Sequence, residues 1–417
     1  MSQKHTPDLS LIKRIADDVG TPFYLYDESV IDDHARRLSE AFSWNPGFRE
    51  YFAVKATPNP YVIDIMTRRG CGVDCASRTE LMLAKAMGLR GERIMFSSNQ
   101  TPGCEYRLAR ELDATINLDD ISHIDFLREN GGIPKRLCLR YNPGSTQVAS
   151  NFVMGHPQDS KFGMTRAQIH ECVKRLIDLG VEKFGLHAFL ISNCVDTDYY
   201  PQIASLLFGL ALEIYRETGA IVDFINLSGG IGVAYHPEER EADIGEVGRA
   251  VRRDYERLIK DTPLHPMKVY TELGRWMTAE SGMLVSKVIH KKDTYKNYIG
   301  LDATACDLIR PAMYSAYHHI TVAGKADLPC DHIYDVVGSL CENNDKFAVD
   351  RRLPNIDVGD YIVIHDAGAH CRAMGYNYNG KLRCGEVLFR PDGSYKLIRR
   401  HETPRDYFAT LDYPGLV

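Results

Sequence analysis

Along the first two thirds of the chain, short apolar runs alternate with longer stretches in which apolar residues recur at helical spacing. The clearest helical stretch spans 199–217, and another helix is expected across 29–43. The short runs predict strands near 51–56, 71–76, 93–98, 114–118, 136–142, 182–189, 222–228 and 267–272. Eight strands that alternate with helices predict a (β/α)₈ barrel, with a doubly wound parallel sheet as the alternative.

After about residue 280 the pattern changes to short strands and turns. Strands are expected at 283–290, 297–301, 332–338 and 360–365, followed by a hairpin turned by 391–393. These features predict a second, mostly β domain, and the apolar run at 22–27 can add a strand to its sheet. We therefore expect an N-terminal strand segment over 1–28, a barrel over 29–278 and a C-terminal β domain over 279–417.

Composition and charge favour a globular protein that does not bind nucleic acid or cross a membrane. The 417 residues are enough for two domains, and the net charge of −6 gives no reason to expect nucleic acid or an anionic membrane as a partner. No apolar run has the length needed to cross a bilayer, and the N-terminus lacks the apolar segment of a secretion signal. The eleven cysteines are an odd number without a CxxC pair, so we expect reduced thiols in a cytoplasm and no metal site.

A lysine stands at the end of the first predicted barrel strand. Lys55 follows the apolar run Tyr51–Val54, and catalytic groups of barrels gather at the C-terminal ends of strands. An ammonium that is buried without a partner is costly, so a buried Lys55 needs an ion-pair partner or a covalent role. The alternative is a strand-end lysine whose amine reaches solvent.

Two further strand ends carry candidate chemistry. The seventh predicted strand ends in the glycine-rich segment Ser228–Gly232, which suits either a phosphate held by backbone N–H groups or a tight turn without a ligand. The eighth ends in Thr271–Arg275, where Glu272 and Arg275 flank Gly274. That pair suits a protonated ring nitrogen and an anion, or else a surface ion pair.

The predicted β domain contributes a thiol among acidic groups. Cys341 precedes Glu342 and lies close to Asp345, a setting that suits a proton donor better than a thiolate nucleophile. The alternative is an ordinary buried cysteine. Farther on, the tyrosines of 376–379 are either core residues or ligand contacts.

Taken in order, these segments resemble the fold-type III pyridoxal phosphate decarboxylases, which combine an alanine-racemase-like barrel with a β domain. The matching segments are Phe52–Ala56, Val73–Ser77, Glu80–Leu81, Arg140–Gly144, Lys161–Gly163, Ser228–Gly232, Glu272–Arg275, Leu308–Tyr314, Cys341–Glu342, Asp366–Ala369 and Met374–Asn379.

The resemblance implies a pyridoxal 5'-phosphate cofactor and a homodimer with shared active sites. Lys55 would form the Schiff base with the cofactor, and Cys341 of the partner subunit would be the catalytic acid. The implied cofactor contacts are Lys55, Asp74, Phe189, Ser192, Gly229, Gly230, Gly232, Glu272, Gly274, Arg275 and Tyr378. The implied contacts to the amino-acid substrate are Arg275, Arg310, Tyr314, Glu342 and Tyr378.

Within that family the chain is most similar to the diaminopimelate decarboxylases, which implies decarboxylation of meso-diaminopimelate to L-lysine and CO₂. Alternatives are another diamino acid, such as ornithine, D-lysine or carboxynorspermidine, and a catalytically silent regulatory homologue. Three departures from the family pattern bear on the site. Phe189 stands where the family has a histidine stacked on the cofactor ring, Ile191 replaces a glycine, and His370 replaces a tyrosine.

Overall fold

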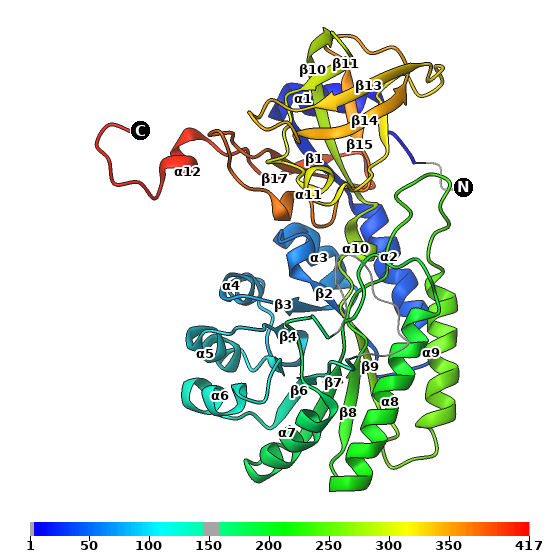
Figure 1. Ribbon diagram of the computed structural model, residues 1–417, viewed down its shortest axis with the longest axis vertical. Coiled ribbons are helices and arrows are strands. Elements are labelled where there is room, and N and C mark those ends of the chain that lie inside the picture. The colour runs from blue at the N-terminus through cyan, green and yellow to red at the C-terminus, as the bar shows by residue number, and fades with distance from the viewer. Residues whose placement is uncertain (1–3, 145–157, 417) are drawn as a thin grey trace. The chain divides into compact units, whose positions relative to one another are not determined.

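The computed structural model describes residues 4–144 and 158–416, which form two compact units (Figure 1). The first unit comprises Asp32–Val233 and Glu241–Met277. The second combines the chain up to Ile31, the segment Ala234–Arg240 and the chain from Thr278 onward. The expected domain limits at residues 28 and 278 stay a prediction of the sequence.

The first unit is a closed barrel of parallel strands, as the sequence predicted. Its strands are β2 (Arg49–Ala53), β3 (Gly72–Cys75), β4 (Ile94–Ser97), β5 (Thr115–Leu118), β6 (Arg136–Arg140), β7 (Lys183–His187), β8 (Val222–Asn226) and β9 (Lys268–Thr271). Pairing of β2 with β9 closes the barrel, with Arg49 opposite Tyr270. All eight expected strands are confirmed, and the doubly wound alternative is wrong.

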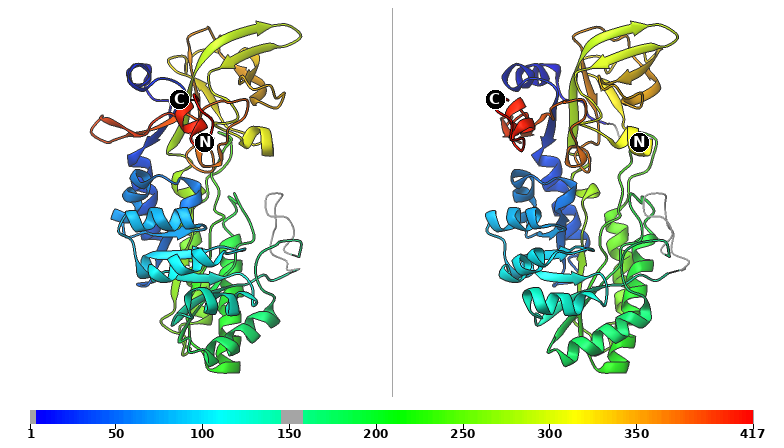
Figure 2. Two further views of the ribbon diagram at one scale, coloured as in Figure 1. Left: turned by 90° about the vertical axis from the view of Figure 1, so that its left-hand side faces the viewer. Right: turned by 60° about the vertical axis from the view of Figure 1, so that its left-hand side comes forward.

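Helices cover the outside of the barrel, as the cyan and green segments of Figure 2 show. They are α2 (Glu28–Ala41), α3 (Pro60–Arg68), α4 (Arg78–Ala86), α5 (Gly103–Glu111), α6 (His123–Gly131), α7 (Arg166–Asp178), α8 (Tyr199–Thr218) and α9 (Ile244–Leu258). The predicted helices at 29–43 and 199–217 correspond to α2 and α8. The apolar stripe of α8 is buried, because Ile203, Leu207 and Ile214 lie on one side of the helix.

Large side chains fill the barrel interior. Tyr51, Met95, Cys138, Phe224 and Tyr270 form one buried cluster. Such a layer of inward-pointing side chains makes the barrel a packed core rather than a pore. Functional groups are therefore confined to the strand ends and the loops that follow them.

The second unit is built on a nine-stranded sheet with the order β14-β13-β11-β10-β1-β16-β17, to which β15 and β12 are added beside β10. The strands are β1 (Phe23–Asp27), β10 (Gly282–Asp293), β11 (Asn297–Leu301), β12 (Ile320–Val322), β13 (His332–Val337), β14 (Lys346–Leu353), β15 (Tyr361–Ile364), β16 (Gly385–Phe389) and β17 (Tyr395–Arg399). Strand β1 pairs antiparallel with β10 and parallel with β16, so the expected contribution of an N-terminal strand to the β domain is confirmed.

Short helices complete the described chain. They are α1 (Leu9–Val19), α10 (Arg275–Thr278), α11 (Arg310–Tyr314) and α12 (Pro404–Phe408), with the single turns η1 (Val54–Ala56), η2 (Gly91–Arg93) and η3 (Arg372–Met374). Helix α1 buries Ile12 and Ile15 against Phe23, Val285 and Val387 of the sheet. Of the helices in the two described ranges, none has the length and apolar character to cross a membrane. The cytoplasmic location stays a prediction.

Candidate active site

A buried carboxylate, Glu272, lies at the C-terminal ends of the barrel strands and directly follows β9. Its Oε1 accepts hydrogen bonds from Asn226 Nδ2 at 2.6 Å and from Ser97 Oγ at 3.4 Å. Its Oε2 accepts from Ser228 Oγ at 3.1 Å and lies 3.1 Å from His187 Nε2. The partners come from the ends of β4, β7 and β8, so four strand ends converge on one carboxylate.

These neighbours decide the protonation of Glu272. Burial opposes ionisation, but His187, Lys55 and the hydrogen bond from Asn226 hold the pKa of Glu272 well below its usual range. Burial also lowers the pKa of His187, so the imidazole is neutral and donates its Nε2 proton to Glu272. Glu272 is therefore an ionised carboxylate in a buried site.

A second buried carboxylate, Asp74 of β3, lies beside the lysine. Its Oδ2 is 3.7 Å from Lys55 Nζ, and neither of its oxygens has a hydrogen-bond partner within the described residues. Burial, followed by repulsion from Glu272, raises the pKa of Asp74 to about 8. At neutral pH the site therefore contains one ionised and one largely protonated carboxyl group.

Of the two interpretations of Lys55, the buried amine is wrong and the amine that reaches solvent is confirmed. Strand β2 ends at Ala53, and Lys55 lies in the turn η1 that follows it. The side chain is 51% exposed, because the turn takes the chain out of the buried strand before the lysine. A role for Lys55 thus depends on its position next to Asp74, and not on the cost of burying an ammonium.

The glycine-rich segment after β8 packs against the loop that follows β7. The N–H of Cys194 donates to Gly230 O, and the N–H of Gly232 donates to Cys194 O, both at 2.8 Å. A Cβ at Gly229 would lie 2.7 Å from the carbonyl oxygen of Glu272, so only glycine allows this approach. The N–H of Gly232, which we expected to hold a phosphate, is thus already used within the chain.

The loop that follows β7 carries two of the residues that depart from the family pattern, Phe189 and Ile191. Phe189 has a ring carbon 3.9 Å from the position that a Cβ of Gly229 would take. Ile191 is buried, and its carbonyl oxygen lies 2.8 Å from the position that a Cβ of Gly230 would take. Ser192 follows and is partly buried. The structure thus places Phe189 and Ile191 against the glycine turn.

The remaining expected residues lie in two places. Gly274 and Arg275 follow Glu272 directly, and Arg275 begins α10 in the barrel unit. The other expected residues, all in the β unit, are Arg310 and Tyr314 at the two ends of α11, Cys341 and Glu342 between β13 and β14, and Tyr378.

Within the β unit the structure brings together the loop that carries Cys341 and Glu342, here called the cysteine loop, and the turn 376–381, here called the tyrosine loop. The N–H of Cys341 donates to Asn379 Oδ1 at 2.7 Å. Cys341, Glu342 and Tyr378 are all exposed, so the interpretation of Cys341 as an ordinary buried cysteine is wrong. Arg310, in contrast, is buried.

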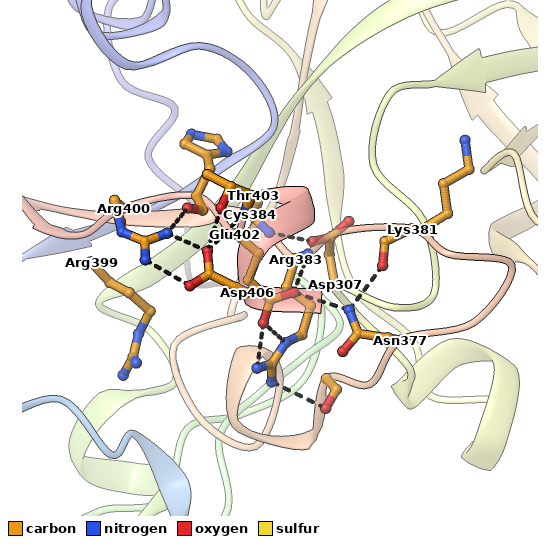
Figure 3. Close-up of polar contacts among 12 residues, drawn as sticks. Asp307, Asn377, Lys381, Arg383, Cys384, Arg399, Arg400, Glu402, Thr403 and Asp406 are labelled. Carbon is orange, nitrogen blue, oxygen red and sulfur yellow. Dashed lines mark hydrogen bonds and ion pairs between the residues drawn. The ribbon is translucent and has the colours of Figure 1, made fainter. Parts of the chain in front are cut away.

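The tyrosine loop is anchored by a carboxylate far along the chain (Figure 3). Glu402 accepts from Asn377 Nδ2 at 3.0 Å, from Arg383 N at 2.9 Å and from Arg383 Nε at 2.7 Å. Asn377 also donates to Lys381 O at 2.9 Å. Glu402 therefore ties together the two ends of the turn that carries Tyr378.

The sequence reading missed the residues that hold Glu272. His187, Asn226 and Ser97 had no assigned role, although each ends a barrel strand, and Ser228 was assigned only to the glycine-rich segment. A polar residue at the last position of a buried strand was the signal, because strand ends of a parallel barrel meet on one face.

The barrel residues fit a pyridoxal phosphate cofactor. The half-exposed amine of Lys55 lies beside Asp74 and can react with the aldehyde carbon of a cofactor. The oxygens of Asp74 have no hydrogen-bond partner within the described residues. Glu272 is held ionised, and an adjacent carboxylate keeps a basic ring nitrogen protonated. The glycine turn lies next to this carboxylate, because a Cβ at Gly229 would be 2.7 Å from the carbonyl oxygen of Glu272.

Comparison with known proteins agrees with this fit. Residues 28–279 match the family model described as "Pyridoxal-dependent decarboxylase, pyridoxal binding domain". Protein TabA of Pseudomonas amygdali pv. tabaci is 36% identical over 403 residues, which cover 97% of this chain and 94% of that protein. Diaminopimelate decarboxylase of Methanothermobacter thermautotrophicus is 33% identical over 403 residues, which cover 96% of this chain and 94% of that protein.

Solved structures give the same assignment. The crystal structure of diaminopimelate decarboxylase from M. jannaschii superposes with a TM-score of 0.88 at 27% identity, covering 96% of this chain and 94% of that one. The barrel and the β domain are thus common to both chains. The chain belongs to the pyridoxal-dependent decarboxylases and is a carboxy-lyase that uses pyridoxal 5'-phosphate.

Proposed function

We propose that this chain decarboxylates meso-diaminopimelate to L-lysine and CO₂. The observation that carries the proposal is a buried cation without a counter-ion. Arg310 is 7% exposed, and its side chain donates hydrogen bonds to Tyr235 and His318 and also contacts the thiol of Cys371. Within the described residues no carboxylate forms an ion pair with it, and a buried charge without a partner is costly. A carboxylate at the far end of the substrate would supply that partner, and a guanidinium suits it in shape.

Relatives support the choice of substrate. Diaminopimelate decarboxylases are matched over nearly their whole length at 30–33% identity. The substrate has an ammonium next to its far carboxylate, and Glu342 is the proposed partner of that ammonium. Arg275 and Tyr314 would complete the binding of the far carboxylate.

When bound, pyridoxal phosphate supplies an electron sink for the pair left behind as the α-carboxylate departs. Lys55 would bind the cofactor aldehyde through its amine, and Glu272 would hold the ring nitrogen protonated. Asp74 would contribute a protonated carboxyl group, and Phe189 an apolar ring face. The proposed phosphate contacts are Gly230, Gly274, Arg275 and Tyr378, and Ser192 and Gly229 are further proposed cofactor contacts. Gly232 is no longer proposed as a phosphate donor, because its N–H already donates to Cys194 O.

We also propose a homodimer in which Cys341 of one copy protonates the reacting carbon in the other. Mixing two inactive variants, Lys55→Ala and Cys341→Ala, tests this arrangement. Half of the randomly formed dimers would contain one intact site of two, so the mixture should regain about a quarter of wild-type activity. No recovery after exchange of subunits, or an active monomer in light scattering, would exclude the shared site.

A CO₂-release assay tests the substrate. The purified chain with pyridoxal phosphate should release CO₂ from meso-diaminopimelate and form L-lysine. The panel should also contain ornithine, both forms of lysine, carboxynorspermidine and the LL and DD forms of diaminopimelate. Faster release from one of these would replace the proposed substrate, and no release from any would indicate a silent homologue.

One observation favours a second candidate, the decarboxylation of another diamino acid. Phe189 and Ile191, which lie against the glycine turn, change the shape of the cofactor's surroundings relative to the family pattern. A site of different shape can prefer a different substrate. The same panel separates the two candidates.

A further inference from the structure

Two buried side chains of the β unit accept hydrogen bonds from the guanidinium of Arg310, which also contacts the buried thiol of Cys371. Its Nη1 donates to Tyr235 Oη at 2.8 Å and to His318 Nε2 at 2.9 Å. Its central carbon lies 4.6 Å from the centroid of the Tyr235 ring, within the range of a cation–π contact. Tyr235 and His318 are 5% and 0% exposed, so neither can be replaced by solvent in this role.

The contact fixes the tautomer of His318. An arginine in a protein is always protonated and can only donate, so Nε2 of His318 must carry the lone pair. The ring proton is then on Nδ1, where it donates to the carbonyl oxygen of His365 at 2.8 Å. His365 directly follows β15, and its N–H donates to His319 O at 2.9 Å. The backbone next to the sheet thus sets the orientation of the imidazole.

Tyr235 is fixed from the other side. The carbonyl oxygen of Ala234 accepts a hydrogen bond from Lys4 Nζ at 2.7 Å, and the same amine pairs with Asp366 Oδ1 at 2.9 Å. The amine of Lys4 therefore holds the residue before Tyr235 in the β unit. Both partners of Arg310 have a defined position that does not depend on a ligand.

We propose that His318 and Tyr235 are positioning residues that aim Arg310 at a carboxylate on the far end of the substrate. The inference rests on the proposed function and adds how the selectivity for that carboxylate arises. Both partners are neutral acceptors, so they orient the guanidinium without neutralising it. A carboxylate in the place of His318 would compete with the substrate for the same charge.

Two probe molecules isolate the contribution of the far carboxylate to binding. L-lysine, the proposed product, keeps the far carboxylate, whereas 1,5-diaminopentane has the same chain and both amines without it. Their dissociation constants for the pyridoxal phosphate form are measured from the change in cofactor absorption, which does not require turnover. The wild-type chain should bind L-lysine more tightly than 1,5-diaminopentane.

The variants remove one contact at a time. His318→Phe keeps a ring but loses the acceptor, and His318→Gln keeps an acceptor oxygen near the Nε2 position. Tyr235→Phe keeps the ring face and loses the hydroxyl. His332→Phe is the matched control, because His332 is exposed and bonds only to Asp331 within the described residues.

We expect His318→Phe to weaken L-lysine binding by about tenfold, the scale of one hydrogen bond to a charged group, and to leave 1,5-diaminopentane unchanged. Tyr235→Phe should act in the same direction, His318→Gln should restore most of the affinity, and His332→Phe should change neither constant. In combination with Arg310→Met, the effect of His318→Phe should disappear, because the group that it orients is already missing.

Equal losses for the two probes, or additivity with Arg310→Met, would overturn the positioning role. If His318→Phe does not fold, Tyr235→Phe and His318→Gln decide the same question. A wild-type chain that shows the predicted selectivity but releases no CO₂ from meso-diaminopimelate refutes the proposed function and leaves the positioning intact. A wild-type chain that releases CO₂ from meso-diaminopimelate but binds both probes equally refutes the positioning role and leaves the proposed function intact.

Discussion

Asp366→Asn should remove a pH dependence of stability that arises in the β unit. Asp366 is 2% exposed, and its Oδ1 accepts from Lys4 Nζ at 2.9 Å. Its Oδ2 has no hydrogen-bond partner within the described residues. Burial raises the pKa of Asp366 to about 7, even though Lys4 acts in the opposite direction.

The direction in which stability changes with pH follows from the number of protons that the folded and unfolded chains bind. The ordinary pKa of an aspartate is 3.8, so between about pH 4 and pH 7 the folded chain binds more protons at Asp366 than the unfolded chain does. Stability therefore falls as pH rises through this window and levels off above it. A separation of about three pKa units corresponds to ~4 kcal/mol in total, of which about 3 kcal/mol is lost between pH 5 and pH 8.

An asparagine stays neutral at every pH and should not show this loss. Its amide oxygen can still accept from Lys4, and its NH₂ group takes the place of an oxygen that already lacks a partner. The free energy of unfolding in guanidinium chloride is measured at pH 5 and pH 8 for the wild type, for Asp366→Asn and for the exposed control Asp392→Asn. From pH 5 to pH 8 the free energy of unfolding of the wild type should fall by about 3 kcal/mol more than that of Asp366→Asn. Parallel profiles would refute the assignment of a raised pKa to Asp366.

Three further substitutions test the barrel and the thiol. Lys55→Ala, reconstituted with pyridoxal phosphate, should lack the Schiff-base absorption band that borohydride removes from the wild type, and an unchanged spectrum would refute the lysine assignment. Cys341→Ala should lower kcat far more than cofactor affinity, and equal losses would count against a proton donor. Gly229→Ala should destabilise the barrel by about 1–3 kcal/mol, since the added carbon would lie 2.7 Å from Glu272 O; an unchanged melting temperature would show that the turn can relax.

The barrel could be predicted from the sequence because each strand is a buried run followed by a helix of regular period. The strands that the sequence analysis missed, β12 and β14 of the β unit, show a weaker pattern of apolar residues. Strand β12 has only three residues, Ile320–Val322. Strand β14 includes the charged run Asp350–Arg352, because one side of this edge strand is exposed. Short and solvent-facing strands do not show the run of apolar residues on which the prediction was based.

The site was predictable in part, and for different reasons at different residues. Glu272 and the glycine turn could be located because they follow strands of the barrel and match a family pattern. The exposure of Lys55 could not, because it depends on the turn η1, which the apolar run Tyr51–Val54 does not reveal. Glu402 could not be linked to the tyrosine loop either, since a contact between 377 and 402 leaves no local pattern.

The replacement of the stacking histidine by Phe189 has a consequence for proton transfer. A phenyl ring has no proton to give, and the Nε2 proton of His187 is already donated to Glu272. Glu272 is itself ionised and accepts from several donors, so it is not an acid at neutral pH. Under the proposed function, the amine of Lys55, the largely protonated carboxyl group of Asp74 and the thiol of Cys341 are then the candidates to protonate the reacting carbon. Cys341→Ala distinguishes the thiol from the two barrel groups: retained kcat would assign the proton to Lys55 or Asp74, and a large loss with intact cofactor binding would assign it to the thiol.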